Sequence, residues 1–202
     1  MHISQHYHLL RNLPAHPIQR LSKIRGGDMF LSSLQLQILN PFIEESLFIL
    51  DKTLGLSSNS NDGFQEKLED FKFKGYAVVT NTSGSITGRI LIHHYSETAL
   101  EIGHRLLQKK GVEVNNNEEM DDEISNALAE FALSIIEPAI SALHNSDIDI
   151  KVSQPYFVSD TEKIDHMLEE VQEIITVPIQ VDKIGRFYLN YLIHENANPE
   201  NK

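Results

Sequence analysis

Apolar residues recur along the chain with two different periods, which together predict both helices and strands. Apolar residues alternate with glutamines at positions 34 to 38, which is typical of a short strand. The dipeptide Asn40-Pro41 then predicts the N-cap and the first residue of a helix. Gly55 is well placed to end that helix, whose apolar stripe comprises Ile43, Leu47, Leu50 and Leu54.

Alternation of period two predicts a hairpin, followed by a second helix. In the first strand, alternate positions on one face are taken by Phe71, Phe73, Ala77 and Val79, and the turn is predicted at 81–84. In the return strand, alternate positions on one face are taken by Ile86, Gly88, Ile90 and Ile92. Ser96 can cap the second helix, whose buried side comprises Ala99, Ile102, Leu106 and Leu107. Three histidines flank this junction without further ligands at metal-binding spacing, which predicts ordinary surface or boundary positions for His93, His94 and His104.

A long third helix is predicted after the polar loop at 114–117. Acidic residues at 118–122 are favoured at a helix N-terminus, and attraction of a basic partner is the alternative interpretation. Pro138 is expected to bend this helix near the Ser134 carbonyl. The core stripe comprises Ile124, Leu128, Phe131, Ile135, Ala139 and Leu143. A second, exposed stripe comprises Asn126, Glu130, Leu133, Glu137 and Ser141, in which Leu133 is the apolar exception.

The remainder of the chain predicts strands. Ile148, Ile150 and Val152 alternate before Pro155 interrupts the pattern. A terminal hairpin follows at 175–193 with Gly185 in its turn, and Pro178 indicates that its strand is at an edge or bulged. The fold class is therefore α+β, with an antiparallel sheet of about six strands, two long helices packed on one face and an N-terminal helix.

Composition narrows the possible functions. The chain has 202 residues, and a net charge of −12 argues against nucleic acid as a partner, because phosphate backbones are bound by clustered Lys and Arg. The absence of Cys excludes disulfides and thiolate metal sites, and it fits a cytoplasmic location. The longest apolar stretch, at 131–143, contains Glu137 and Pro138, so we expect a buried helix and no membrane insertion.

The first 28 residues differ in composition from the rest. They hold four basic residues and one acidic residue, together with His2, His6, His8 and His16. We interpret residues 1–28 as a flexible extension, or as lying upstream of a start at Met29, and the histidines as part of that tail rather than a metal site. Residues 29–202 are expected to form one domain.

Common catalytic motifs for nucleotide binding, zinc hydrolysis and serine hydrolysis are absent from the sequence. Four segments carry a different pattern: Gly84-Ser-Ile-Thr-Gly-Arg-Ile-Leu-Ile, Ser96-Glu-Thr-Ala-Leu-Glu-Ile, Asp121-Asp-Glu-Ile-Ser-Asn-Ala-Leu-Ala-Glu-Phe-Ala-Leu and Val152-Ser-Gln-Pro. In type and order they resemble the CheX branch of the CheC/CheX/FliY chemotaxis phosphatases, and Asn40-Pro41-Phe42-Ile43 is similar to the family's opening.

The resemblance implies a protein that docks a long helix on a phosphorylated CheY-type response regulator. In the family, an Asn amide orients a water for attack on the aspartyl phosphate, and a Glu pairs with a Lys of the regulator. The regulator supplies the Mg²⁺, so no cofactor of the chain's own is implied. Glu130 matches the catalytic Glu, Asn126 occupies a position that is usually Asp or Ser, and Pro155 lies near the position of the family's Pro.

Leu133 falls where the family has its catalytic Asn, and a Leu side chain cannot orient water by hydrogen bonding. Two hypotheses follow. The first is a phosphatase, with Asn126 substituting from one turn earlier. The second is a catalytically degenerate binding module that contacts a receiver domain or another chain through Asn126, Leu133, Glu137 and Pro155. The resemblance also implies a homodimer, and the terminal hairpin supplies an edge that would need covering.

Overall fold

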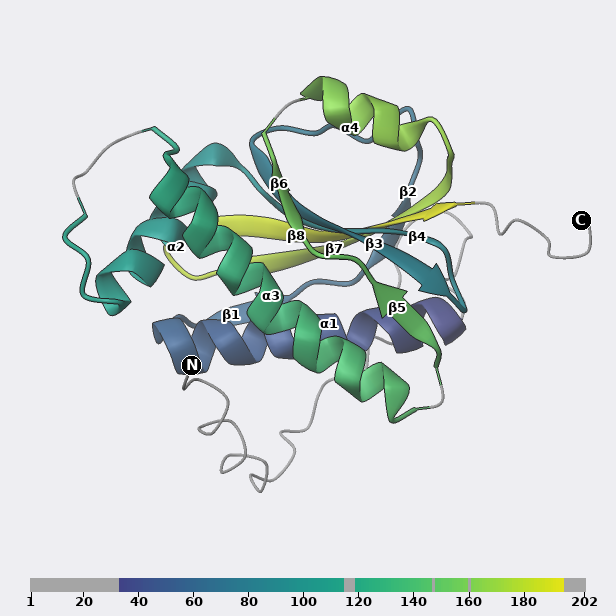
Figure 1. Ribbon diagram of the computed structural model, residues 1–202, viewed down its shortest axis with the longest axis horizontal. Coiled ribbons are helices and arrows are strands. Elements are labelled where there is room, and N and C mark those ends of the chain that lie inside the picture. The colour runs from purple at the N-terminus through teal and green to yellow at the C-terminus, as the bar shows by residue number, and fades with distance from the viewer. Residues whose placement is uncertain (1–32, 115–118, 147, 160, 195–202) are drawn as a thin grey trace, which may run out of the picture.

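The computed structural model describes residues 33–114, 119–146, 148–159 and 161–194 (Figure 1). The predicted extension at 1–28, with its four histidines, lies outside the described residues. In chain order, the elements are α1 (Ser33–Leu54), β1 (Ser58–Ser60), β2 (Phe64–Glu66), β3 (Tyr76–Gly84), β4 (Gly88–His94), α2 (Ser96–Lys109), α3 (Asp122–His144), β5 (Ile150–Val152), β6 (Tyr156–Val158), α4 (Thr161–Leu168), β7 (Val171–Val181) and β8 (Gly185–His194).

All eight strands belong to one antiparallel sheet, in the order β1-β7-β8-β4-β3-β5. The two short strands off this path extend it, because β2 also pairs with β7 and β6 also pairs with β3. The sheet thus has six positions across its width, as the sequence predicts, and the α+β fold class is confirmed. The terminal hairpin is confirmed as well, because β7 and β8 pair along most of their length.

The terminal hairpin lies inside the sheet, so the expectation that it offers an uncovered edge is wrong. Strand β8 pairs with β4, and the outer side of β7 pairs with β1 and β2. Pro178 lies between these two pairings, since β1 reaches Ile179 and β2 begins opposite Thr176. The Pro178 carbonyl accepts a hydrogen bond from the Asn61 N–H at 2.9 Å. The missing donor of Pro178 therefore falls at a gap in the ladder.

One face of the sheet is covered by α1, α2 and α3, which enclose the main core (Figure 1). The apolar stripe predicted for α3 is buried in full, and so is the stripe predicted for α2. In the terminal hairpin, the in-phase residues of β7 and the large side chains Phe187, Leu189 and Tyr191 of β8 point into the same core. The periodicity of these elements therefore predicts correctly which face of each is buried.

The opposite face of the sheet carries a second core, which the sequence analysis did not predict. Helix α4 covers this face, and Ile164 from α4 is fully buried there. Strand β3 contributes side chains to both cores, because Val78 points into the main core whereas Ala77 and Val79 point into the second. The remaining buried members of the second core are Phe71, Phe73, Leu91, Val158, Val171, Ile174 and Leu192.

The predicted bounds of the first hairpin are displaced. Strand β3 begins at Tyr76 and continues through the predicted turn to Gly84, and the turn lies at 85–87. Phe71 and Phe73 precede the strand, although they join Ala77 and Val79 in the second core as their shared phase indicates. The bulky aromatic side chains are thus fixed by burial in a loop rather than by a strand ladder.

The strand predicted at 34–38 is wrong, because α1 begins at Ser33 and runs through this segment. Pro41 lies inside the helix rather than at its start. Its missing N–H would otherwise bond the carbonyl of Gln37, and Gln37 is exposed, so water can satisfy that carbonyl. The predicted end of α1 is confirmed, since Gly55 follows the helix with a φ of +64°.

Helix α2 begins one residue earlier than the predicted cap implies. Tyr95 occupies the N-cap position but its side chain does not cap the helix, and Ser96 is the first helical residue. Further along α2, Gly103 is buried directly against α3. A Cβ atom at Gly103 would lie 2.5 Å from the Cγ2 atom of Ile124, so only glycine permits this approach of the two helices.

Two of the histidines predicted at the surface are buried. His93 and His94 are adjacent in β4, so their side chains point to opposite faces of the sheet, and both faces are covered. His94 stacks on Phe187 in the main core with a centroid separation of 4.9 Å. Its Nε2 atom has no hydrogen-bond partner among the described residues, and burial lowers the pKa of His94 to about 3.

We expect the substitution Gly103→Ala to destabilise the protein. The new methyl group forces α2 away from Ile124, an overpacking cost of about 1–3 kcal/mol that exceeds the gain in helix propensity of about 1 kcal/mol. Urea unfolding should therefore show a net loss of about 1 kcal/mol. In an Ile124→Ala background the same substitution should be neutral or stabilising, and an equal loss in both backgrounds would contradict this packing argument.

Stability should fall with acidification because of His94. The unfolded chain takes up a proton near pH 6.5, whereas the folded chain holds His94 neutral until about pH 3. The folded state therefore loses about 2 kcal/mol between pH 7 and pH 5 through this residue. Chemical unfolding of a His94→Leu variant at both pH values should show a correspondingly smaller loss, and the exposed control His166→Gln should behave like the unsubstituted protein.

Candidate functional site

Helix α3 presents the predicted candidate site on a face that is fixed by its N-terminal cap and its buried stripe. The Asp121 carboxylate accepts a hydrogen bond from the Ile124 N–H at 2.8 Å, which caps the helix. The expectation that acidic residues cap this end is thus confirmed for Asp121. The helix then runs without interruption through Pro138 to His144.

The exposed stripe predicted on α3 is confirmed at every position except Leu133, and Ser141 at its end is exposed as predicted. Asn126, Glu130 and Glu137 are exposed, whereas Leu133 is half-buried. We call these four residues the α3 ribbon. An exposed carboxylate, an exposed amide and a partly covered apolar side chain along one helix face form a surface that suits protein contact. Leu133 is thus less exposed than the sequence pattern predicts.

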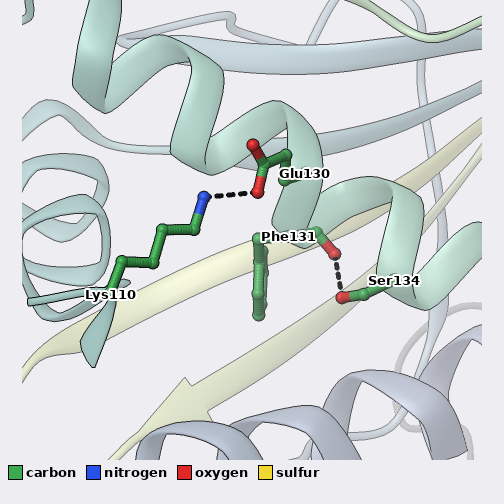
Figure 2. A network of polar contacts seen from close by, with 4 residues as sticks. All are labelled: Lys110, Glu130, Phe131 and Ser134. Carbon is green, nitrogen blue, oxygen red and sulfur yellow. Dashed lines mark hydrogen bonds and ion pairs between the residues drawn. The ribbon is translucent and has the colours of Figure 1, made fainter. Parts of the chain in front are cut away.

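Within the α3 ribbon, Glu130 is held by an ion pair. The Nζ atom of Lys110 donates to the Glu130 carboxylate, as Figure 2 shows. Phe131, the next residue of α3, instead points toward the sheet and packs edge-on against Phe187 at a centroid separation of 6.2 Å. The same turn of helix thus anchors α3 in the core through Phe131 and offers its carboxylate to solvent through Glu130.

Lys110 reaches Glu130 from the end of α2, where its backbone is fixed. Lys110 is the C-cap, and Gly111 follows with a φ of +77°. The N–H of Gly111 donates to the carbonyl of Gln108 at 2.9 Å, and the N–H of Val112 donates to the carbonyl of Leu107 at 3.1 Å. These two bonds form a Schellman motif, which ends α2 abruptly and sets the starting point of the Lys110 side chain.

Neither position 133 nor its neighbours on α3 offer a side chain that is free both to donate to a water and to accept from it. Leu133 has no polar side-chain atom. The Ser134 hydroxyl donates its hydrogen to the Phe131 carbonyl at 2.6 Å, so it can accept from a water but not donate to one (Figure 2). Asn126 therefore contributes the one side-chain amide of the ribbon. An amide can both donate and accept, but this one lies a full turn before Glu130.

Pro155 lies in a connection between two short strands that contact α3. It connects β5 and β6, both of which pair with β3 and contact α3. The His144 imidazole further ties the end of α3 to this edge, with its Nε2 atom 2.8 Å from the Ile150 carbonyl oxygen. The place of Pro155 in the predicted site stays a prediction.

Lys110 is the residue of this site that the sequence analysis missed. It is on another helix and twenty residues before Glu130, so no helical spacing connects the two. The sequence does contain a partial signal, because a Lys followed by Gly is typical of a helix end. That signal fixes where α2 ends, but not which part of α3 lies opposite.

Two other site classes were sought in the structure. Among the described residues, no group of three or more His, Asp and Glu side chains is close enough to hold a metal ion. Helix α3 is long and apolar enough by composition to cross a membrane, but half of its apolar window is buried inside the protein. It serves here as the central core helix.

The fold was compared with known proteins. No protein-family model and no curated protein matches the sequence. Solved structures do match: CheX of Vibrio vulnificus shares 18% identity with a TM-score of 0.62, over 78% of this chain and 99% of that one. FliY of Thermotoga maritima shares 14% identity with a TM-score of 0.59, over 82% and 92%.

A third structure is the CheX-CheY-BeF3-Mg²⁺ complex of Borrelia burgdorferi. It shares 21% identity with a TM-score of 0.60, over 78% of this chain and 98% of that one. Nearly the whole length of each of these proteins is thus matched by this chain, at identities that establish the fold alone. The chain has the fold of the CheX/CheC-like chemotaxis proteins.

Proposed function

We propose that this chain binds a phosphorylated CheY-type receiver domain through the α3 ribbon. The observation that carries the proposal is the position of Glu130, which is exposed on the unpacked face of α3 in a CheX-like fold. A structural relative was crystallised with CheY, BeF3 and Mg²⁺. Glu130 supplies the acceptor for a cation of the receiver, and the half-buried Leu133 supplies apolar contact beside it.

We propose further that binding, rather than hydrolysis, is the main activity. Orienting a water requires a side chain that donates and accepts hydrogen bonds, and Leu133 does neither. The neighbouring Ser134 hydroxyl donates its hydrogen to the Phe131 carbonyl, so it can accept from a water but not donate to one. The alternative, a phosphatase, is supported by the exposed amide of Asn126 on the same face. In both cases Mg²⁺ belongs to the receiver, and the location is cytoplasmic, where such receivers act.

A homodimer belongs to the proposal through the family resemblance alone. The edge that the terminal hairpin was expected to supply is already paired within the chain. The two outer positions of the sheet are instead formed by three-residue strands, β1 with β2 and β5 with β6. Sedimentation at micromolar concentration measures the oligomeric state directly.

The carboxylate of Glu130 should be required for receiver binding. We expect Glu130→Gln to weaken binding tenfold or more, because the variant loses the charge that attracts the receiver's cation. Isothermal titration calorimetry with a CheY-type receiver loaded with BeF3 and Mg²⁺ measures the loss. Glu44→Gln, a change of the same charge on α1, should leave the affinity unaltered. Undetectable binding by the unsubstituted chain would refute the proposed function.

Restoring an amide at position 133 should create phosphatase activity. We expect the unsubstituted chain to leave the decay of the receiver's aspartyl phosphate almost unchanged, and Leu133→Asn to accelerate it at least tenfold. The expected size follows from the loss of about 10²-fold when one positioning group is removed from a catalytic site. Acceleration by the unsubstituted chain that disappears in Asn126→Ala would favour the phosphatase alternative instead.

A further inference from the structure

We propose that Lys110 is a specificity-determining residue of the α3 ribbon, because it occupies the Glu130 carboxylate until a partner's cation displaces it. This inference rests on the proposed function, in which Glu130 contacts a receiver domain. Among the described residues, Lys110 is the one ion-pair partner of Glu130. The unbound chain therefore offers a Glu130 carboxylate that is already paired, and full binding requires a cation that replaces Lys110.

The contact is a consequence of the fold rather than a chance meeting of two long side chains. Gly103 allows α2 to lie directly on Ile124 of α3, which fixes the distance between the helices. The Schellman motif at Gly111 then ends α2 with Lys110 as its C-cap. From Ile124 to Glu130 there are fewer than two helical turns, so the end of α2 faces that part of α3.

The ion pair is weak enough to be exchanged. The side chain of Lys110 is 46% exposed and that of Glu130 is 62% exposed, so water screens both charges. Exposed pairs of this kind correspond to roughly a 1.5- to 5-fold effect on an equilibrium constant. A partner without a cation opposite Glu130 leaves the Lys110–Glu130 pair intact. A partner with such a cation breaks this weak pair and forms a new ion pair with Glu130 that is less exposed to water.

Charge at this position therefore discriminates between partners. A receiver that places an ammonium group against the ribbon replaces Lys110 with a contact that excludes water on one side. A neutral or acidic surface finds the Glu130 carboxylate already occupied. Removing Lys110 should increase the affinity for a cationic partner, because no internal ion pair has to be broken first.

The test is a double-mutant cycle of binding to a CheY-type receiver loaded with BeF3 and Mg²⁺. We expect Lys110→Met to tighten binding roughly 2- to 5-fold, as the exchange cost disappears. In a Glu130→Gln background, the same substitution should have no effect. Lys52→Met is the matched control. It removes the same charge, and Lys52 also forms an exposed ion pair, with Asp51 on α1. It should leave the affinity unchanged.

The outcomes separate this inference from the proposed function. If the unsubstituted chain binds and Glu130→Gln weakens binding, but Lys110→Met leaves the affinity unchanged or lowers it, the inference is wrong and the proposed function stands. If Lys110→Met and Lys52→Met tighten binding equally, net charge explains the effect and the inference is also wrong. Absence of binding by the unsubstituted chain overturns both.

Discussion

The burial of α3 between the sheet and its neighbouring helices is the constraint on which the rest of the structure depends. Ten side chains of this helix are buried, from Ile124 to Leu143. Fully burying one large apolar side chain contributes about 1.5–3 kcal/mol, so rotation of α3 about its axis would expose several of them at great cost. Because an α-helix has a fixed period, burial of this stripe also determines which residues of α3 face solvent. The orientation of Glu130 thus follows from the core.

Packing likewise determines the electrostatics of the α3 ribbon. Gly103 sets how closely α2 approaches α3, and the turn at Gly111 sets where α2 ends. These two backbone features bring Lys110 and Glu130 together. Because the pair is exposed, its attraction adds little to the stability of the folded protein. A contact that contributes so little to folding is free to serve binding, since losing it leaves the helices in place.

Long periodic elements could be predicted from the sequence, and short ones could not. The stripe of α3 spans about five turns, from Ile124 to Leu143, so only the helical period fits it. Alternation over 34–38 covers too few residues to separate a strand from the first turns of α1, and Asn40-Pro41 mimics a helix start. Strands β1 and β2 have no apolar pattern, because their pairing with β7 forms them. The burial of His93 and His94 could not be predicted from local spacing, because it requires that both faces of the sheet be covered: His94 stacks on Phe187 of the main core, and His93 stacks on Phe73 of the second core.

In the candidate site, too, features that follow from the helical period could be predicted, and features that depend on neighbouring elements could not. The phase of α3 predicts that Asn126, Glu130 and Glu137 are exposed, since exposure depends on period alone. The partial burial of Leu133 and the pairing of Glu130 with Lys110 depend on neighbouring elements, which a local pattern does not encode. This difference bears on function. Binding needs only a helix face of the right shape and charge, whereas hydrolysis needs a water-orienting group placed to within a fraction of an ångström. On the proposed function, the Glu130 carboxylate and its helix face therefore meet what docking requires, whereas Leu133 supplies no group that can orient a water.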